Sequence, residues 1–415
     1  MGKRLHGGIA AVSRRGFVGS GLALGAASVV ARVSVGRAAV GANDRIRLGI
    51  VGLGVRGAHH VNWVARHAKE CNASVVAVCD VWKPNLDRAA ASVKDRFGEA
   101  PKTSTRYGDL LAMDDLDAVV VATPDFSHMK IALAALEAGK DVYIEKPMSL
   151  SVEEANRAID LTREKQAVVQ IGTQRRSDGI LAAMRELLKT GVLGPISRVS
   201  MEYNFNEPRW ARTYADCKKE DTDWDAFLLD LPPREFDPRL LRRWYLFKEF
   251  TNGISGLWLP HFSDATNAVL GSTYPRSAVT LGGTYVWKED REHCDTYRTL
   301  LDFPEDFLMC WGFALGNESG RYWTIHGTKG TLDALGGKLL RDGGKDTAIE
   351  DRAIEPFANE SHMANWLDCI RSRKTPNAPV ETGHQHSITA IMAANALHTG
   401  QRQVYDRESR TVRAG

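Results

Sequence analysis

The sequence has few cysteines, and none of them follows a pattern typical of a metal or redox site. There are only six in 415 residues. None belongs to a C-x-x-C pair or to the Cys/His spacing of a zinc site, so we predict no metal centre. An oxidising compartment would permit disulfides, but no pair can be assigned. The six are Cys71, Cys79, Cys217, Cys294, Cys310 and Cys369.

The chain also lacks a strong excess of charge of either sign. Its formal net charge is +3, and no basic stretch alternates with aromatic residues. Proteins that bind nucleic acid usually concentrate basic residues on one surface, so nucleic acid is not an expected partner. Apolar residues make up 43% and charged residues 25%, which is ordinary for a globular protein. The length allows more than one domain.

No apolar run is long and strong enough to predict a membrane anchor. Gly16–Ala31 is rich in Gly and Ala and ends at Arg32, whereas a spanning helix needs about 20 strongly apolar residues. It follows Ser13-Arg14-Arg15, an order typical of a twin-arginine export signal. We predict that residues 1–42 are a cleaved signal peptide recognised by the twin-arginine export machinery, and that the mature protein is periplasmic. The alternative is a chance Arg-Arg pair in a disordered N-terminus.

Residues 45–172 alternate short β-branched runs with amphipathic helical segments. This alternation predicts an α/β Rossmann domain, in which a doubly wound parallel sheet carries helices on both faces. Ser151 and Glu154 form a capping box that predicts the start of one helix. The strand-like runs are Arg47–Val51, Val75–Cys79, Ala118–Ala122, Val142–Glu145 and Val168–Gly172.

Residues 173–400 have a different pattern, because strand-like runs follow one another with Gly-rich turns between several of them. We predict a second α/β domain with an open, mostly antiparallel sheet that serves substrate binding and oligomerisation. His362–Arg373 and His386–His398 are predicted as closing helices. The strand-like runs are Arg198–Phe205, Ala278–Trp287, Thr296–Phe303, Leu308–Ala314 and Tyr322–Gly327.

The first strand-like run leads into a G-x-G-x-x-G motif, which predicts a dinucleotide site. The glycines permit a tight turn and close approach of a pyrophosphate to the helix N-terminus that follows. Asp80 ends the second run, near the expected spacing for a ribose-binding carboxylate, and favours NAD over NADP. NADP remains possible because Lys83 and Arg56 are close in sequence. The expected contacts here are Gly52, Gly54, Val55, Arg56, Gly57 and Asp80.

Further motifs follow the later strands of the Rossmann pattern and continue into the second domain. They are Ala122–His128, Glu145–Pro147, Gly172–Ser177, the His261-x-x-Asp264 pair and Asn365–Arg373. In combination they make the sequence resemble the Gfo/Idh/MocA family of NAD(P)-dependent oxidoreductases, and especially its exported twin-arginine branch. The resemblance covers essentially the whole mature chain.

The resemblance implies that the nicotinamide lies between the two domains, beside the Glu-Lys-Pro segment. It implies sugars, polyols or their acids as substrates and a homo-oligomer built through the second sheet. By position, Lys146 would be the catalytic lysine, and His261 would be the substrate-side acid/base or hydroxyl-binding histidine. The further cofactor contacts that it implies are Thr123, Pro124, His128, Glu145, Lys146 and Gln174.

The chemistry of alcohol oxidation is consistent with these roles. The C–H hydrogen leaves as hydride, so a base must accept the hydroxyl proton. Burial and a neighbouring positive charge lower the pKa of a lysine such as Lys146, and a histidine such as His261 can relay a proton near neutral pH. The alternatives are a surface lysine in a strand-end turn and a histidine packed beneath Trp258.

The sequence departs from the family pattern directly before His261. Many relatives have the pattern Asp-x-Gly-x-His-x-x-Asp. Here Leu257 stands at the position of the first Asp, and Leu259 stands at the position of the Gly. Loss of a general base can cost roughly 10²–10⁴-fold in rate. Either Lys146 and His261 suffice, or the substrate differs, or the site is degenerate, and Asp264 is predicted to be structural. Candidate sugar contacts, each with a core or rim role as alternative, are Arg175, Arg176, Tyr203, Asn204, Arg209, Trp210, Trp244 and Tyr245.

We therefore predict an exported NAD-dependent oxidoreductase that transfers hydride at a secondary alcohol of a sugar, polyol or sugar derivative and retains its cofactor. Retention is expected because the periplasm offers no reliable soluble nicotinamide pool. One alternative is a glycosidase-like hydrolase or epimerase that oxidises its substrate transiently. Another is a degenerate sugar- or cofactor-binding protein without activity.

Overall fold

The computed structural model describes residues 44–415, with gaps at 210–211 and 345–348. The predicted signal peptide and the candidate sugar contact Trp210 lie outside the described residues. All six cysteines lie within them and carry free thiols. No helix in the described ranges is long and apolar enough to cross a bilayer.

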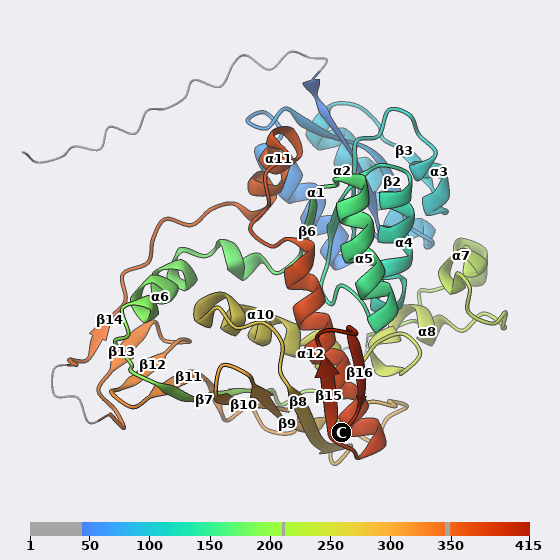
Figure 1. Ribbon diagram of the computed structural model, residues 1–415. Helices are drawn as coiled ribbons and strands as arrows, with labels where there is room; N and C mark the ends of the chain where they lie inside the picture. The colour runs from blue at the N-terminus through green and yellow to red at the C-terminus, as the bar shows by residue number, and fades with distance from the viewer. Residues whose placement is uncertain (1–43, 210–211, 345–348) are drawn as a thin grey trace, which may run out of the picture. The chain divides into compact units, whose positions relative to one another are not determined.

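The N-terminal part is a six-stranded parallel sheet of order β3-β2-β1-β4-β5-β6, as the Rossmann prediction requires (Figure 1). The short edge strand β3 has no counterpart among the predicted runs. Each of the central strands β4 and β5 is buried along its whole length, which explains their continuous apolar sequences. The strands are β1 (Ile46–Val51), β2 (Ala73–Cys79), β3 (Lys102–Ser104), β4 (Ala118–Val121), β5 (Asp141–Ile144) and β6 (Val169–Ile171).

Helices cover both faces of this sheet. One face packs on α3 (Tyr107–Leu111), α4 (Asp125–Glu137) and α5 (Val152–Lys165). The other face packs on α1 (Val55–His67), α2 (Lys83–Phe97) and α11 (His362–Ser372). Because Trp366 of α11 is fully buried there, this late helix completes the N-terminal core, although the sequence prediction assigned it to the second domain.

The predicted start of α5 at Ser151 is confirmed, but only half of the capping box forms, because the Ser151 N–H donates to Oγ of Ser149 and not to Glu154. The Ser151 side chain accepts a hydrogen bond from the backbone N–H of Glu154 at 3.2 Å. This satisfies one of the N–H groups that the first turn of a helix leaves without a partner.

The C-terminal part contains a ten-stranded sheet of order β14-β13-β12-β11-β7-β10-β9-β8-β15-β16. Strands β7 and β10 pair in parallel and the other neighbours are antiparallel, so the predicted mostly antiparallel sheet is confirmed. The longer strands are β7 (Ile196–Tyr203), β8 (Ser277–Gly283), β9 (Thr296–Phe303), β10 (Phe307–Ala314) and β11 (Arg321–Gly327).

Five short strands of this sheet were not predicted. They are β12 (Thr331–Asp333), β13 (Lys338–Leu340), β14 (Arg352–Ala353), β15 (Gln403–Asp406) and β16 (Thr411–Ala414). Because β15 pairs with β8, the sheet continues beyond residue 400, where the predicted domain stopped.

One face of the ten-stranded sheet is covered by α6 (Gly179–Lys189), α10 (Leu259–Leu270) and α12 (Val380–Thr399) (Figure 1). Side chains on that face, such as Leu301 and Met309, are fully buried. Strand alternation therefore places the neighbouring residues, such as Leu300 and Leu308, on the opposite face, where both are exposed.

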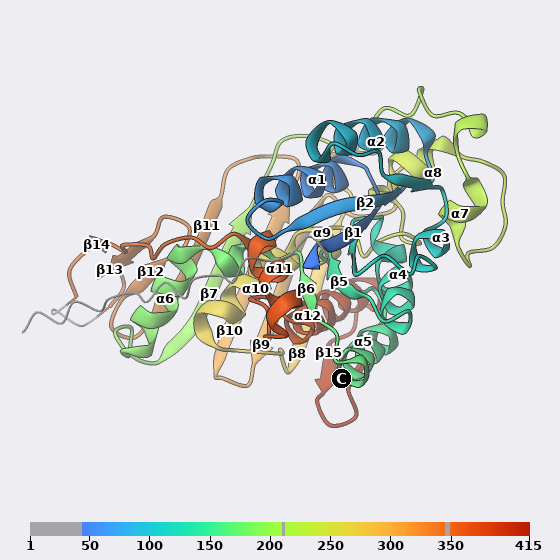
Figure 2. The same cartoon turned by 90° about the horizontal axis from the view of Figure 1, so that it is seen from above.

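Short elements between β7 and β8 form a separate aromatic layer. They include α7 (Trp224–Leu228), α8 (Pro238–Arg242), η4 (Trp244–Leu246) and α9 (Ile254–Leu257). Figures 1 and 2 both show α7 and α8 beside the α3–α4 end of the N-terminal sheet. The apolar side chains of α7, α8 and η4 pack around Phe126 of α4, which ties this layer to the Rossmann part, whereas Ile254 of α9 belongs to the core of the ten-stranded sheet.

Candidate active site

The glycine motif forms the tight strand-to-helix turn that the sequence predicts. Gly52 has φ +87°, and a Cβ there would lie 2.7 Å from the backbone of Ala122. A Cβ on Gly57 would lie 1.9 Å from the carbonyl oxygen of Gly52, so α1 can pack this closely only with glycine at that position. A Cβ on Gly54 would meet no atom within 4 Å. Gly54 thus borders open space at the point where a Rossmann fold binds a pyrophosphate.

The N-terminus of α1 is suited to an anion. Gly54 is the N-cap, no side chain caps the helix, and its first turn contains no acidic residue. Free N–H groups and the helix dipole both favour negative charge at this point. Val55 is 61% exposed, and Arg56 adds a positive charge beside it.

Asp80 fixes the glycine turn as well as facing the cavity. Its Oδ2 accepts from the backbone N–H of Leu53 at 2.6 Å, and its Oδ1 accepts from that of Trp82 at 2.9 Å. Burial raises the pKa of this carboxyl, while these hydrogen bonds oppose the shift. The carboxylate retains lone pairs for ribose hydroxyl groups, so its position fits the predicted role.

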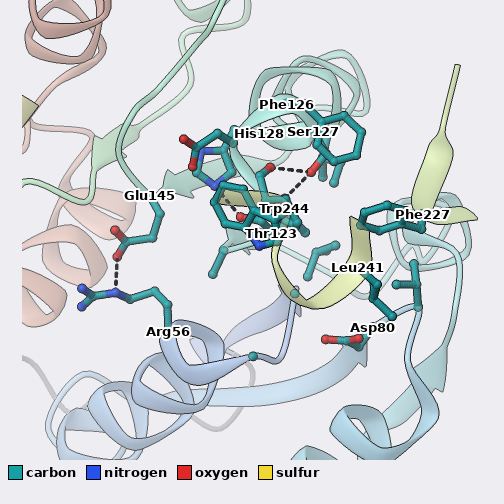
Figure 3. Close-up of a pocket in the computed structure, with 18 of the residues that line it drawn as sticks. Arg56, Asp80, Thr123, Phe126, Ser127, His128, Glu145, Phe227, Leu241 and Trp244 are labelled. Atoms are coloured by element: carbon teal, nitrogen blue, oxygen red, sulfur yellow. Dashed lines mark hydrogen bonds and ion pairs between the residues drawn. The ribbon is translucent and has the colours of Figure 1, made fainter. Parts of the chain in front are cut away.

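A cavity of about 480 Å³ brings most of the predicted site residues together. In Figure 3 the Arg56–Glu145 pair lies at one end, and Asp80 lies at the other with Leu241 and Phe227. Of the predicted residues, the cavity is lined by Gly52, Gly54, Val55, Arg56, Asp80, Thr123, Pro124, His128, Glu145, Lys146, Trp244, Tyr245 and His261.

Glu145 is a buried carboxylate held by several neighbours. Its Oε1 accepts from Nε2 of His60 at 2.9 Å and from Nε2 of Gln174 at 3.0 Å, and it pairs with Arg56 at 3.7 Å. Burial works against ionisation, but the His60 hydrogen bond and the Arg56 charge prevail and lower the pKa of Glu145 to about 2. Gln174, predicted as a cofactor neighbour, acts here by orienting Glu145 rather than by lining the cavity.

Lys146 points across the site towards α9. Its Nζ donates to the backbone carbonyl of Leu257 at 2.9 Å. Burial lowers the pKa of Lys146, and the negative charges of Asp125 and Glu145 oppose the shift. A lowered pKa makes the neutral amine accessible, and only the neutral amine can accept a proton.

His261 lies on the first turn of α10 and lines the same cavity as Lys146. Burial, followed by the positive charge of Lys146, lowers its pKa well below the ordinary value. Its ring packs edge-on against Trp258 at 6.1 Å between centroids. The alternative prediction, a histidine packed beneath Trp258, is therefore correct about the contact with Trp258. The His261 ring nevertheless also lines the cavity.

The sequence analysis did not single out Asp125, although it lies within a quoted motif. Asp125 is only 3% exposed, lines the cavity and accepts from Oγ1 of Thr251 at 2.8 Å. Thr251 Oγ1 in turn accepts from the N–H of Gly253, which directs its own proton to Asp125. Burial raises the pKa of Asp125, while the charge of Lys146 opposes that shift. The role of Asp125 could not be predicted from a sequence motif, because its hydrogen-bond partner Thr251 lies far away in the chain.

Several predicted sugar contacts lie away from the cavity. Arg176 is engaged by Asp264 at 2.8 Å, which also supports the structural role predicted for Asp264. Arg175 stacks on Trp323, and Tyr203 stacks on Trp258 with centroids 5.4 Å apart. The remaining two are Asn204, which donates to Glu202 and Ser319, and Arg209, which lies over Phe205.

Residues from the layer between β7 and β8 supply a wall that the sequence analysis largely missed. Trp244 and Tyr245 were candidates, but Phe227, Leu241 and Arg242 were not. Their sequence carries no motif, and only the fold brings them opposite the glycine turn.

A sequence profile of the Gfo/Idh/MocA oxidoreductases matches the chain in two parts. The part described as an NAD-binding Rossmann fold matches residues 46–173, and the C-terminal alpha/beta domain matches residues 185–405. The chain belongs to the Gfo/Idh/MocA oxidoreductase family. This Gfo/Idh/MocA protein therefore has the family's NAD-binding domain and is an NAD(P)-dependent oxidoreductase.

Relatives of known name include dehydrogenases and a glycosidase. Inositol 2-dehydrogenase 4 of Saccharopolyspora erythraea is 29% identical over 337 residues, which are 80% of this chain and 87% of that protein. A glycosyl hydrolase family 109 protein of Shewanella baltica is 28% identical over 219 residues, or 50% of this chain. That match spans only 47% of the hydrolase, so less than half of its length is represented.

Solved structures with the same fold include sugar-nucleotide and sugar dehydrogenases. The WlbA dehydrogenase of Bordetella pertussis, solved with NADH and UDP-GlcNAcA, has a TM-score of 0.66 at 20% identity. It covers 87% of this chain and 99% of its own. A levoglucosan dehydrogenase with NADH and levoglucosan has a TM-score of 0.63 at 17% identity, covering 86% and 98%. At these identities the likeness shows a shared fold.

The geometry fits the cofactor that the family implies. An open space at Gly54, an uncapped helix N-terminus and the carboxylate of Asp80 suit a pyrophosphate and a ribose. Bound NAD would supply a nicotinamide that accepts or returns a hydride. Among the described residues, no cluster of three or more acidic, histidine or cysteine side chains is suited to a metal ion.

Proposed function

We propose that this protein is an exported NAD-dependent oxidoreductase that acts on a secondary alcohol of a sugar, polyol or sugar derivative and retains its cofactor. The observation that carries this proposal is the single cavity shared by the glycine turn, Asp80, Lys146 and His261. It supports a dinucleotide at one end and proton-transfer groups at the other.

In the oxidation direction, neutral Lys146 accepts the hydroxyl proton while the C–H hydrogen leaves as hydride. The Leu257 carbonyl holds Nζ in place for this step. His261 holds the reacting hydroxyl group, because its lowered pKa keeps the ring neutral and a neutral ring nitrogen can accept a hydrogen bond from that group. In reduction the ammonium group of Lys146 returns the proton.

The missing carboxylate of the family pattern is replaced by a different arrangement. Leu257 has no acidic side chain, but its backbone oxygen contacts Lys146. Asp125 supplies the only negative charge besides Glu145 among the groups that act on Lys146 in the described structure. We therefore assign the role of tuning Lys146 to Asp125.

A carbohydrate substrate is supported by the walls of the cavity and by the named relatives. Trp244, Tyr245 and Trp258 line the cavity, and aromatic faces suit the apolar faces of sugar rings. The relatives include an inositol dehydrogenase, and a levoglucosan dehydrogenase shares the fold.

Lys146→Met tests the catalytic assignment. A panel of sugars, polyols and sugar acids is screened for formation of reduced nicotinamide, with the exposed Lys165→Met as the control. We expect K146M to lose roughly 10²–10⁴-fold in turnover while still binding NAD. Full activity in K146M would refute the role of Lys146, and no turnover with any of the alcohols would refute the substrate class.

Export and cofactor retention are tested on the mature protein purified without added nicotinamide. The denatured protein is analysed by mass spectrometry for NAD(H) per chain, and its N-terminus is sequenced. We expect near-stoichiometric NAD(H) and cleavage near residue 42. An empty protein would contradict retention, and an intact N-terminus in the cytoplasmic fraction would contradict export.

A second candidate is a glycosidase that uses transient oxidation without net redox change. The match to the glycosyl hydrolase family 109 protein favours it, although that match covers less than half of the hydrolase. Cleavage of aryl glycosides without added nicotinamide, abolished in K146M, would support it. Failure with a broad set of glycosides would exclude it in favour of the dehydrogenase.

The uncovered face of the ten-stranded sheet supports a homo-oligomer. Strand register places Val279, Leu281, Leu300, Leu308 and Tyr322 on that face, with exposed fractions from 38% to 80%. An apolar patch of this kind is typical of a protein interface. Light scattering should show an oligomer that Leu281→Glu dissociates, while Phe357→Glu, at an exposed residue beside α6 on the covered side of the sheet, leaves it intact.

A further inference from the structure

Residues 222–250, which we name the strap, cross from the second domain to the cofactor-binding edge of the Rossmann sheet. Figures 1 and 2 show its helices α7 and α8 at that edge. The apolar side chains of the strap form a small core together with Phe126 of α4, in which Phe250 is fully buried. It is therefore a packed element and not an extended loop.

The first anchor of the strap is Asp223. Its carboxylate accepts from Oγ1 of Thr105 at 2.8 Å and from the guanidinium of Arg106 at 3.2 Å. Its backbone N–H donates to the carbonyl of Val81 at 2.8 Å. Val81 directly follows Asp80, so this anchor holds the loop that carries the ribose-binding carboxylate.

A second anchor joins the strap to the same loop. The guanidinium of Arg242 lies 4.6 Å from the ring centroid of Trp82, within the range of a cation–π interaction. An isolated antiparallel bridge also connects Trp82 with Thr222.

The third anchor lies on α4. The ring of Phe126 packs against Phe250 and Phe227 with centroids 5.0 and 5.7 Å away, and its N–H donates to the carbonyl of Phe250 at 3.1 Å. Nearby, Lys130 forms an ion pair with Asp230. The strap is thus fastened on both sides of the cavity.

The inner surface of the strap forms a wall of the cavity. Phe227, Leu241 and Trp244 line it together with Asp80 (Figure 3). Gly54 lines the same cavity. A dinucleotide that places its ribose on Asp80 would lie between the glycine turn and these side chains. Its exit past Asp80 would then be covered by the strap.

We propose that the strap retains the dinucleotide and that Asp223 is the residue that holds the strap closed over it. The cofactor leaves only when the contacts of Asp223 with Thr105, Arg106 and Val81 open, so release is slow relative to turnover. This inference rests on the dinucleotide site of the proposed function. It implies that a second substrate must reoxidise or reduce the nicotinamide in place.

The test measures cofactor release from the mature protein. The protein is loaded with isotopically labelled NAD, separated from free cofactor, and mixed with excess unlabelled NAD, and the label that stays bound is followed with time. The variants are Asp223→Ala and Arg106→Ala, and Asp225→Ala, exposed on the same helix, is the control. Thermal unfolding of each variant checks that it is folded.

We expect release to be at least about tenfold faster in D223A, several-fold faster in R106A and unchanged in the control. Asp223 also caps α7 through the N–H of Ala226, so R106A carries the test if D223A fails to fold. Equal release rates in wild type and R106A would overturn the strap proposal while leaving the bound cofactor established. A wild-type protein that contains no NAD(H) as purified and also binds no added NAD would instead overturn the proposed function itself.

Discussion

At the scale of single residues, the environment of Lys146 determines how the reaction should depend on pH. The amine must be neutral to accept a proton, so oxidation should become faster as the pH rises through the pKa of Lys146. Burial lowers that pKa, and the negative charge of Asp125 raises it in part. The pH profile should therefore have its midpoint below that of an ordinary lysine, near 10.4.

Asp125→Asn should move this midpoint to lower pH, because it removes a negative charge that stabilises the ammonium form. The variant keeps nearly the same shape, and the hydroxyl of Thr251 can still donate to the amide oxygen. Profiles of kcat/KM against pH would be compared with those of Asp225→Asn, in which an exposed carboxylate is removed. A midpoint that stays in place or moves up would contradict the assignment of Asp125.

A second prediction at this scale concerns Asp80. Asp80→Ser should reduce the preference for NAD over NADP by about tenfold or more, equivalent to about 1.4 kcal/mol. A carboxylate repels a 2′-phosphate, and serine removes that charge. The ratio of kcat/KM for the two cofactors would be measured beside Asp87→Ser, which removes an exposed carboxylate on α2. A wild type that already prefers NADP would show the ribose assignment to be wrong.

At the scale of elements, the two glycines of the turn have different roles, since Gly57 allows α1 to pack and Gly54 leaves space for the cofactor. Gly57→Ala should destabilise the protein, because the new Cβ would lie 1.9 Å from the Gly52 oxygen. Gly54→Ala should leave the cofactor-free protein as stable as wild type, because its Cβ meets nothing, but should weaken NAD binding by on the order of tenfold. Calorimetry of each variant with and without NAD distinguishes the two effects, and a stable G57A would contradict the close packing of α1.

The elements also show why some parts were predictable from the sequence and others were not. Strands with β-branched runs were found, and β9 has the predicted bounds. The two- to four-residue strands β12 to β16 escaped prediction because their stability comes from neighbours in the sheet rather than from their own pattern. The helix α11 carried a clear amphipathic pattern, but the pattern does not say which domain its apolar face covers.

At the scale of the whole molecule, buried histidines should make the protein sensitive to acid. Burial lowers the pKa of His293, His362 and His384 to about 4, and that of His386 to about 3. The unfolded chain would bind protons at these positions near pH 6.5, whereas the folded chain would not. Their stabilisation is therefore complete above that pH and is lost as the pH falls towards 4.

Within that window, each of these four histidines should lower the free energy of unfolding by up to about 1.4 kcal/mol for every unit by which the pH falls. Urea unfolding of the cofactor-free protein between pH 8 and 5 measures this. We expect little change from pH 8 to 7 and a steep loss below 6.5. A flat profile down to pH 5 would mean that these side chains are already protonated or accessible in the folded protein.

The sequence by itself determined the fold class, the two-part organisation and the glycine turn with Asp80. These features are local, because strand periodicity, capping and a phosphate-binding turn are each set by residues close together in the chain. The segment that contains Lys146 could be recognised for the same reason. The export signal is a prediction of this local kind, which lies outside the described structure.

Only the tertiary structure decided which side chains meet in the cavity. It brought Asp125 to Thr251, gave Lys146 the Leu257 carbonyl, and engaged Arg176 with Asp264. It also laid the strap against the loop after Asp80. These contacts join residues from distant parts of the chain, and no spacing in the sequence encodes them, because they depend on how two separately predictable layers pack together.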